Sequence, residues 1–183
     1  MSRKVVLYIA TSLDGYIADN NGGIGWLEGH STDPNSDGGY SEFIKDVDTV
    51  ILGATSYNQI VTELSPDFWP YQGMSTYVFT HKKMQDNENA KFISSDIVEF
   101  INKLKNQDGK DIWICGGANP INQLVKANLI DEYHITIMPV ILGSGKKLFS
   151  DNNLRINLKM VQAKDINGLL DVVYVRREDK GKH

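Results

Sequence analysis

The sequence predicts an α/β fold with a largely parallel central sheet and an antiparallel hairpin at its C-terminal end. Short apolar runs rich in β-branched residues alternate with stretches of helical periodicity along most of the chain, which is typical of parallel α/β sheets. The pattern changes near the C-terminus, where Ile156, Leu158 and Met160 alternate with polar residues. Asn167-Gly168 then resembles a tight turn into residues 169–176, which completes the predicted hairpin.

Five strands are expected before the hairpin. Several of them read as nearly continuous apolar runs, as expected for strands that are buried on both faces. They span residues 4–11, 49–52, 75–80, 111–115 and 131–138.

Four helices are expected between these strands. Apolar residues recur at i, i+3, i+4 and i+7 in segments 40–47 and 57–64, and a third helix is expected over 97–104. Ser56, followed three residues later by Gln59, resembles a capping box for the second helix. Asn119-Pro120 pairs a capping residue with a proline at the first helical position, which predicts the start of the fourth helix.

Length and composition predict a single cytoplasmic domain. The 183 residues fit one domain over 1–183, with 178–183 as a polar, frayed tail. No apolar run approaches the ~18 residues of a membrane span, and the start does not resemble a signal peptide. One cysteine and four histidines without ligand spacing give no metal site, and a net charge of -4 without a basic patch argues against nucleic acid. The pairs Lys82-Lys83 and Lys146-Lys147 favour solvated surface.

Two glycine-containing junctions between a strand and a helix could bind a ligand. Gly116-Gly117 stands between an apolar run and a helix start, where free backbone N–H groups beside a helix N-terminus can bind an anion. The alternative is a tight strand-to-helix turn. Gly53 follows another strand in the same way, so the two junctions could face the two phosphates of one dinucleotide. Neither matches the G-x-G-x-x-G fingerprint, and the segment 143–147 fails as a phosphate loop because Val140 stands where that motif needs its first glycine.

A long glycine-rich loop follows the first strand and ends near Trp26. Loops of this length in compact domains are usually functional or disordered. Glycine hinges around Trp26 suit a lid over a ligand, and the alternative is a surface loop with Trp26 packed into the core.

Four motifs occur in order along the chain. They are Ser12-Leu-Asp-Gly-Tyr-Ile-Ala18, Leu52-Gly-Ala-Thr-Ser-Tyr57, Cys115-Gly-Gly117 and Pro139-Val-Ile-Leu-Gly-Ser-Gly-Lys-Lys-Leu-Phe149. In this order and spacing they resemble the dihydrofolate reductase superfamily, and within it the chain is similar to the RibD C-terminal type of riboflavin-biosynthesis reductase over roughly residues 4–177. The resemblance implies a three-layer αβα sandwich and an NAD(P)H-dependent reductase.

The same resemblance implies where the cofactor lies. NADPH, or alternatively NADH, is expected across the C-terminal edge of the sheet, with the nicotinamide against the first strand and the phosphates between the two glycine junctions. It also implies a non-proline cis peptide at Gly116-Gly117. The residues implied in cofactor binding are Ala10, Ile17, Gly53, Thr55, Ser56, Thr80, His81, Lys82, Gly116, Gly117, Ala118 and Asn119.

Fewer residues are expected around the substrate than around the cofactor. Tyr8, Trp26 and Leu27 are expected around the substrate pocket or its lid, and Asp37 and Glu42 are candidate proton donors, for which a solvated or capping role is the alternative. Three positions depart from the family pattern. Ala54 stands where the family often has an arginine, and Tyr8 and Cys115 stand where riboflavin reductases usually have a lysine and a glutamate. The last two differences remove charge from the expected substrate pocket.

These features predict a reductase that transfers a hydride to a small heterocyclic or carbonyl-like substrate. The reaction would be similar to that of 5-amino-6-(5-phosphoribosylamino)uracil reductase or of dihydrofolate reductase. The alternative is a nucleotide-binding module of the same fold that has lost catalysis. The resemblance also implies a homodimer, with the small-molecule substrate as the other partner.

Overall fold

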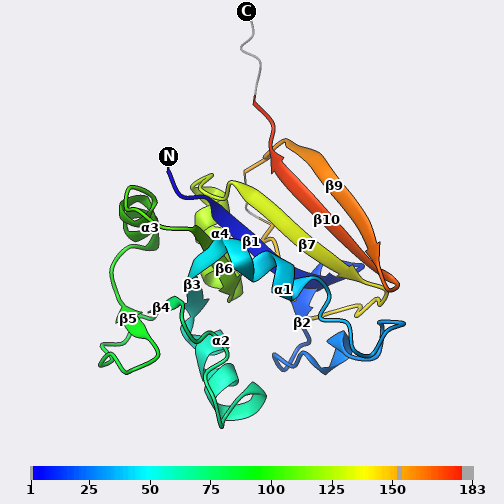
Figure 1. Ribbon diagram of the computed structural model, residues 1–183, viewed down its shortest axis with the longest axis horizontal. Coiled ribbons are helices and arrows are strands. Elements are labelled where there is room, and N and C mark those ends of the chain that lie inside the picture. The colour runs from blue at the N-terminus through cyan, green and yellow to red at the C-terminus, as the bar shows by residue number, and fades with distance from the viewer. Residues whose placement is uncertain (1, 152–153, 179–183) are drawn as a thin grey trace, which may run out of the picture.

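The computed structural model describes residues 2–151 and 154–178, so most of the predicted tail 178–183 lies outside the described residues. An eight-stranded sheet in the order β5-β4-β3-β6-β1-β7-β10-β9 runs through the molecule (Figure 1). The strands from β5 to β7 are parallel, whereas β10 is antiparallel to β7 and β9 is antiparallel to β10. The strands are β1 Val5–Ser12, β3 Val47–Gly53, β4 Ser75–Phe79, β5 Lys91–Ile93, β6 Asp111–Gly116, β7 Glu132–Met138, β9 Leu158–Ile166 and β10 Leu169–Arg176.

Helices cover both faces of this sheet. Successive residues of a strand point to opposite faces, so neighbouring residues belong to two different cores. Ile51 and Ile114 pack in a core with Ile101 and Leu124 of the helices α3 and α4, whereas the neighbouring Leu52 packs in a second core with residues of α2. The predicted α/β fold with a mostly parallel sheet and a C-terminal hairpin is confirmed. The helices are α1 Tyr40–Phe43, α2 Ala54–Gln59, α3 Ile97–Lys105 and α4 Ala118–Lys126.

Shorter elements were not expected from the sequence. The predicted helix over 40–47 is α1 followed by a 3-10 turn, η2 Ile44–Asp46, and Val47 already begins β3. The helix over 57–64 is the end of α2 followed by a π-helical turn, η3 Ile60–Leu64. A separate two-stranded sheet joins β2 Tyr16–Ala18 to β8 Lys146–Lys147, and a 3-10 turn, η1 Gly25–Leu27, lies in the loop after β2.

Both predicted helix starts were wrong, by three residues for α2 and by two residues for α4. α2 begins at Ala54 and α4 at Ala118, each directly after a glycine, and neither has a side-chain cap. Pro120 is therefore the third residue of its helix, where its missing N–H still costs no intrahelical bond. The expected cis peptide was also wrong, because the Gly116–Gly117 bond is trans, like every peptide bond in residues that the structure describes.

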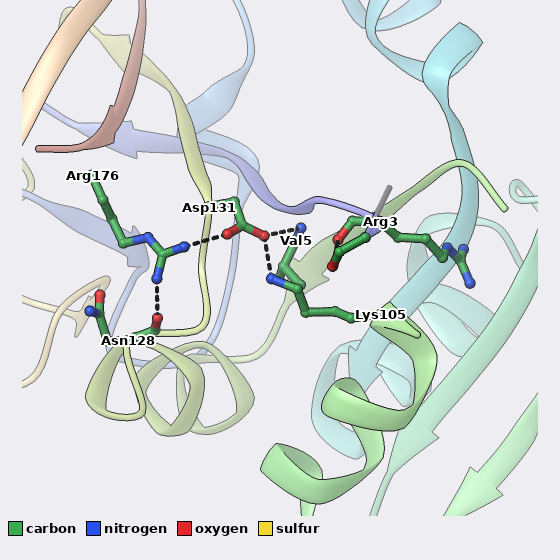
Figure 2. A network of polar contacts seen from close by, with 7 residues as sticks. Arg3, Val5, Lys105, Asn128, Asp131 and Arg176 are labelled. Atoms are coloured by element: carbon green, nitrogen blue, oxygen red, sulfur yellow. Dashed lines mark hydrogen bonds and ion pairs between the residues drawn. The ribbon is translucent and has the colours of Figure 1, made fainter. Parts of the chain in front are cut away.

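Asp131 is the centre of a network of polar contacts at the start of β1 (Figure 2). Asp131 accepts a hydrogen bond of 2.9 Å from the backbone N–H of Val5 and pairs with Lys105 at 2.7 Å. Its other oxygen pairs with Arg176, which also donates to the carbonyl of Asn128 at 2.6 Å. Asp131 thus links the start of β1 to the ends of α3 and β10.

Replacing this carboxylate should destabilise the fold. Asp131→Ala leaves Lys105 and Arg176 without their carboxylate partner, and we expect the free energy of unfolding to fall by about 1–3 kcal/mol. Urea denaturation followed by circular dichroism measures the loss. Glu99→Ala is the matched control, because the Glu99–Lys103 pair on α3 is solvent-exposed and should contribute little. Equal losses in the two variants would contradict a special role for Asp131.

Candidate functional site

Two strand-to-helix junctions meet at the carboxyl edge of the sheet. β3 and β6 are parallel neighbours, so α2 and α4 begin side by side. A Cβ placed on Gly53 would lie 3.6 Å from the Cα of Gly117, and a Cβ on Gly117 would lie 3.3 Å from the Cα of Gly53. Gly117 also has a φ of +96°, which residues with a side chain rarely adopt. Glycine is therefore required here by the turn and by the contact between the two backbones.

The first turns of α2 and α4 present unsatisfied backbone donors. Neither helix has a side chain that caps its N-terminus. Free N–H groups and the positive end of the helix dipole make such a terminus attractive to anions. Both termini border one cavity of about 1350 Å³. A phosphate-bearing ligand in this cavity could therefore meet two helix N-termini at once.

The structure brings together every residue that the sequence predicted for cofactor binding. They come from β1, β2, the end of β4 and the two glycine junctions, and all of them line the same cavity. Their role in binding stays a prediction. These residues are Ala10, Ile17, Gly53, Thr55, Ser56, Thr80, His81, Lys82, Gly116, Gly117, Ala118 and Asn119.

Sequence reasoning missed other residues of the cavity lining. Lys146 was assigned to solvated surface, but it reaches the cavity, with its Nζ 3.6 Å from a Cβ placed on Gly22. The pairing of β2 with β8 brings it there, and no local signal in the sequence indicates that pairing. Tyr71, from the irregular segment before β4, also lines the cavity and was not expected there, whereas Lys83 lines it beside Lys82 in the segment where the family resemblance implies cofactor contacts.

The glycine-rich loop borders the cavity through its backbone and Leu27. The side chain of Gln59 on α2 donates to the carbonyl of Gly22 at 2.9 Å, which fixes the loop against that helix. Leu27 lines the cavity as expected, whereas half-buried Trp26 does not, and its indole N–H donates to Gly23 at 3.2 Å. Asp14 anchors the start of the loop, since it accepts from the hydroxyl of Ser12 at 2.6 Å and the N–H of Gly143 at 2.8 Å.

The two predicted proton donors lie outside the lining of the cavity. Asp37 accepts hydrogen bonds of 2.9 Å from the N–H groups of Gly39 and Ser41 at the start of α1, and its hydrogen bonds with Ser41 lower its pKa. Glu42 pairs with Lys45 on the surface, and that hydrogen bond lowers the pKa of Glu42. The structure thus gives Asp37 a capping role and Glu42 a solvated one, which are the alternatives to proton transfer.

Uncharged polar groups meet at Cys115. The hydroxyl of Tyr71 lies 3.2 Å from the Sγ of Cys115, and both residues line the cavity. Burial raises the pKa of the Cys115 thiol to about 12 and also raises the pKa of Tyr71. Both groups are therefore neutral at pH 7, so this end of the cavity offers weak donors and acceptors without a charge.

Tyr8, the third residue expected at the substrate pocket, lies next to this end but outside the lining. Its ring stacks on Phe43 with centroids 3.9 Å apart and meets the edge of His134 at 4.7 Å. Among the described residues, no helix is long and apolar enough to cross a membrane, and no three metal-ligating side chains gather at one point.

The sequence matches one domain family and two proteins of Bacillus subtilis. It matches the RibD C-terminal domain family over residues 3–169. It is 42% identical over 177 residues to the uncharacterised protein YwjB of Bacillus subtilis (strain 168), covering 96% of this chain and 99% of that one. It is 37% identical over 182 residues to the uncharacterised protein YyaP of the same organism, covering 94% of both chains.

Solved structures show the same fold. A protein of Shewanella sp. PV-4, whose name assigns it to riboflavin biosynthesis, has a TM-score of 0.83 and 27% identity over 97% of this chain and 100% of that chain. A diaminohydroxyphosphoribosylaminopyrimidine deaminase/5-amino-6-(5-phosphoribosylamino)uracil reductase of Thermotoga maritima has a TM-score of 0.70 and 17% identity, over 96% of this chain and 57% of its own.

Dihydrofolate reductase from Enterococcus faecalis, complexed with NADP(H), has a TM-score of 0.66 and 16% identity, over 97% of this chain and 100% of its own. At these identities the last two likenesses concern the fold alone. Together with the match over residues 3–169, the eight-stranded sheet and its two glycine junctions lead to one conclusion. The chain belongs to the family of RibD C-terminal domains.

Proposed function

We propose that this protein is a reductase that uses NADPH, or less favourably NADH, to reduce a small heterocyclic or carbonyl-like substrate. The observation that carries this proposal is the meeting of two uncapped helix N-termini at one cavity of about 1350 Å³. Such a cavity is large enough for a dinucleotide and leaves room for a second small molecule. A fold neighbour complexed with NADP(H) supports the same choice of cofactor.

The residues present fit a dinucleotide. The backbone N–H groups of Thr55 and Ala118 would face its two phosphates, and Lys146 adds a cation in the same cavity. His81, Lys82 and Lys83 line the cavity after β4 and would meet further phosphate charge on the nucleoside part. When bound, the dihydronicotinamide would supply the hydride. The chain itself would bind both ligands, orient them and exclude water.

The runner-up is a nucleotide-binding module without catalysis. It is favoured by one observation, since neither Asp37 nor Glu42 lines the cavity, and so neither is placed to deliver a proton there. The two functions differ in one measurement. A reductase consumes bound NADPH in the presence of some member of a broad panel of heterocycles and carbonyl compounds, whereas the module binds NADPH and never oxidises it.

Binding of the cofactor should be visible by tryptophan fluorescence. Trp69 and Trp113 pack in the core beside α2 and Tyr71, so NADPH in the cavity should quench part of the emission. We expect saturable quenching with a Kd of about 1 µM to 1 mM, the range in which the KM values of enzymes commonly lie. Absence of binding by both NADPH and NADH at millimolar concentration would refute the proposal.

Preference for NADPH over NADH should depend on the lysines after β4. Lys82→Ala and Lys83→Ala each remove an exposed cation at the cavity, and we expect at least one of them to weaken NADPH binding roughly tenfold, or about 1.4 kcal/mol. The affinity for NADH should hardly change, because NADH lacks the extra phosphate. Lys103→Ala on the exposed face of α3 is the control. Equal loss for both cofactors would show that these lysines do not discriminate between them.

A further inference from the structure

A cluster of aromatic rings lies beside one end of the cavity and reaches its lining through Tyr71. Tyr71 lines the cavity and meets Trp113 edge-on at 5.4 Å, and Trp113 in turn contacts Tyr40 at 5.8 Å, Phe43 at 5.4 Å and Tyr8 at 6.0 Å. We call these five residues the aromatic wall. The indole N–H of Trp113 donates to the carbonyl of Tyr8 at 3.0 Å, which fixes the central ring of the wall. Trp113 is buried and Tyr71 lines the cavity, whereas Tyr8, Tyr40 and Phe43 are partly exposed next to that lining.

The polar groups of this wall are neutral hydrogen-bond donors and acceptors. The hydroxyl of Tyr71 lies 3.2 Å from the Sγ of Cys115, and the interaction with Cys115 also contributes, after burial, to the raised pKa of Tyr40. Both phenol rings lie against Trp113, with centroid distances of 5.4 Å for Tyr71 and 5.8 Å for Tyr40. Within residues 2–151 and 154–178, the Tyr40 hydroxyl has no hydrogen-bond partner, so it is available to a ligand. A neutral phenol donates well to a carbonyl oxygen or a ring nitrogen.

The charges next to the aromatic wall are negative. Burial raises the pKa of Tyr8 to about 12, with further contributions from the carboxylates of Asp171 and Asp37. Asp171 is buried beside His134, at 2.8 Å, and Thr136, at 3.0 Å, so it is held in place at this position. A phosphate brought close to these carboxylates would be repelled by their charge.

The lysines that line the cavity after β4 lie away from the aromatic wall along the sheet. Lys82 and Lys83 follow β4, which is separated from β1 by β3 and β6. Three strand spacings correspond to roughly 14 Å. Lys146 faces Gly22 in the glycine-rich loop. These three cations accompany the dinucleotide in the proposed function.

We propose that the end of the cavity at the aromatic wall binds a planar, uncharged and unphosphorylated heterocycle, with Tyr71 and Tyr40 donating hydrogen bonds to its carbonyl oxygen or ring nitrogen. This assignment of a substrate class rests on the reductase function proposed above. Ring contacts with the wall supply most of the affinity, and the two phenols fix the orientation of the ligand. A phosphate ester of the same heterocycle is rejected, because it brings a dianion to a site with carboxylates nearby.

Matched pairs of ligands test this selectivity. Riboflavin and riboflavin 5′-phosphate form one pair, and uridine and uridine 5′-phosphate form the other. Dissociation constants are measured with the full chain saturated with NADP⁺, by flavin fluorescence for the first pair and by calorimetry for the second. We expect the unphosphorylated member to bind at least tenfold more tightly in at least one pair. Tighter binding of the phosphate esters, or no binding of any of the four probes, would overturn the assignment.

Removing single hydroxyls tests the two phenols. Tyr71→Phe and Tyr40→Phe should each weaken the tighter probe about 3–10-fold, the loss typical of one hydrogen bond, while the affinity for NADP⁺ stays unchanged. Tyr77→Phe is the matched control, because Tyr77 packs on Phe100 at 4.9 Å and does not line the cavity. Unchanged probe affinity in both variants would overturn the role of the phenols. If NADP⁺ itself fails to bind, the reductase proposal fails, and the four probes then decide the substrate class on the cofactor-free protein.

Discussion

The contact between the backbones of Gly53 and Gly117 is the constraint on which the candidate site depends. β3 and β6 are parallel neighbours, so their following helices must begin side by side, and a Cβ on Gly53 would come within 3.1 Å of Pro120 and 3.6 Å of Gly117. The glycines thus serve first to pack one junction against the other. The glycines affect ligand binding only indirectly. Because a glycine precedes each helix, neither helix has a side-chain cap, and the first N–H groups stay free for a ligand.

The architecture could be predicted because local patterns of residues in the sequence indicate its strands and its hairpin. Buried parallel strands are near-continuous apolar runs, and Asn167-Gly168 gave the hairpin, where both residues have the positive φ of such a turn, 53° and 90°. Helix starts were harder to predict. Ser56 and Asn119-Pro120 look like capping signals, but the backbone conformation at the preceding glycines begins each helix earlier. The pairing of β2 with β8 joins residues more than a hundred positions apart, and nothing local in the sequence specifies it.

The residues of the site could be predicted only where they follow the carboxyl ends of the parallel strands. The residues around the two glycine junctions and after β4 line one cavity, because the carboxyl ends of parallel strands share an edge of the sheet. Side chains delivered by irregular segments could not be foreseen. Tyr71 reaches the cavity from the segment before β4 and Lys146 from a two-residue strand, whereas Asp37 is occupied with the N–H groups at the start of α1. The result is one cavity that is bordered by cations and two uncapped helix termini, where we propose that a dinucleotide binds, and that has an uncharged end at Tyr71 and Cys115.

The central claim is that one dinucleotide is held by two helix N-termini, and amide chemical shifts measure this most directly. ¹⁵N-labelled protein titrated with NADPH should show its largest amide shifts at Ala54, Thr55, Gly117 and Ala118, the first residues of the two junctions. Amides of α3 such as that of Lys103 should stay nearly unchanged. Saturable binding of NADPH that leaves the amides of both junctions in place would contradict this account.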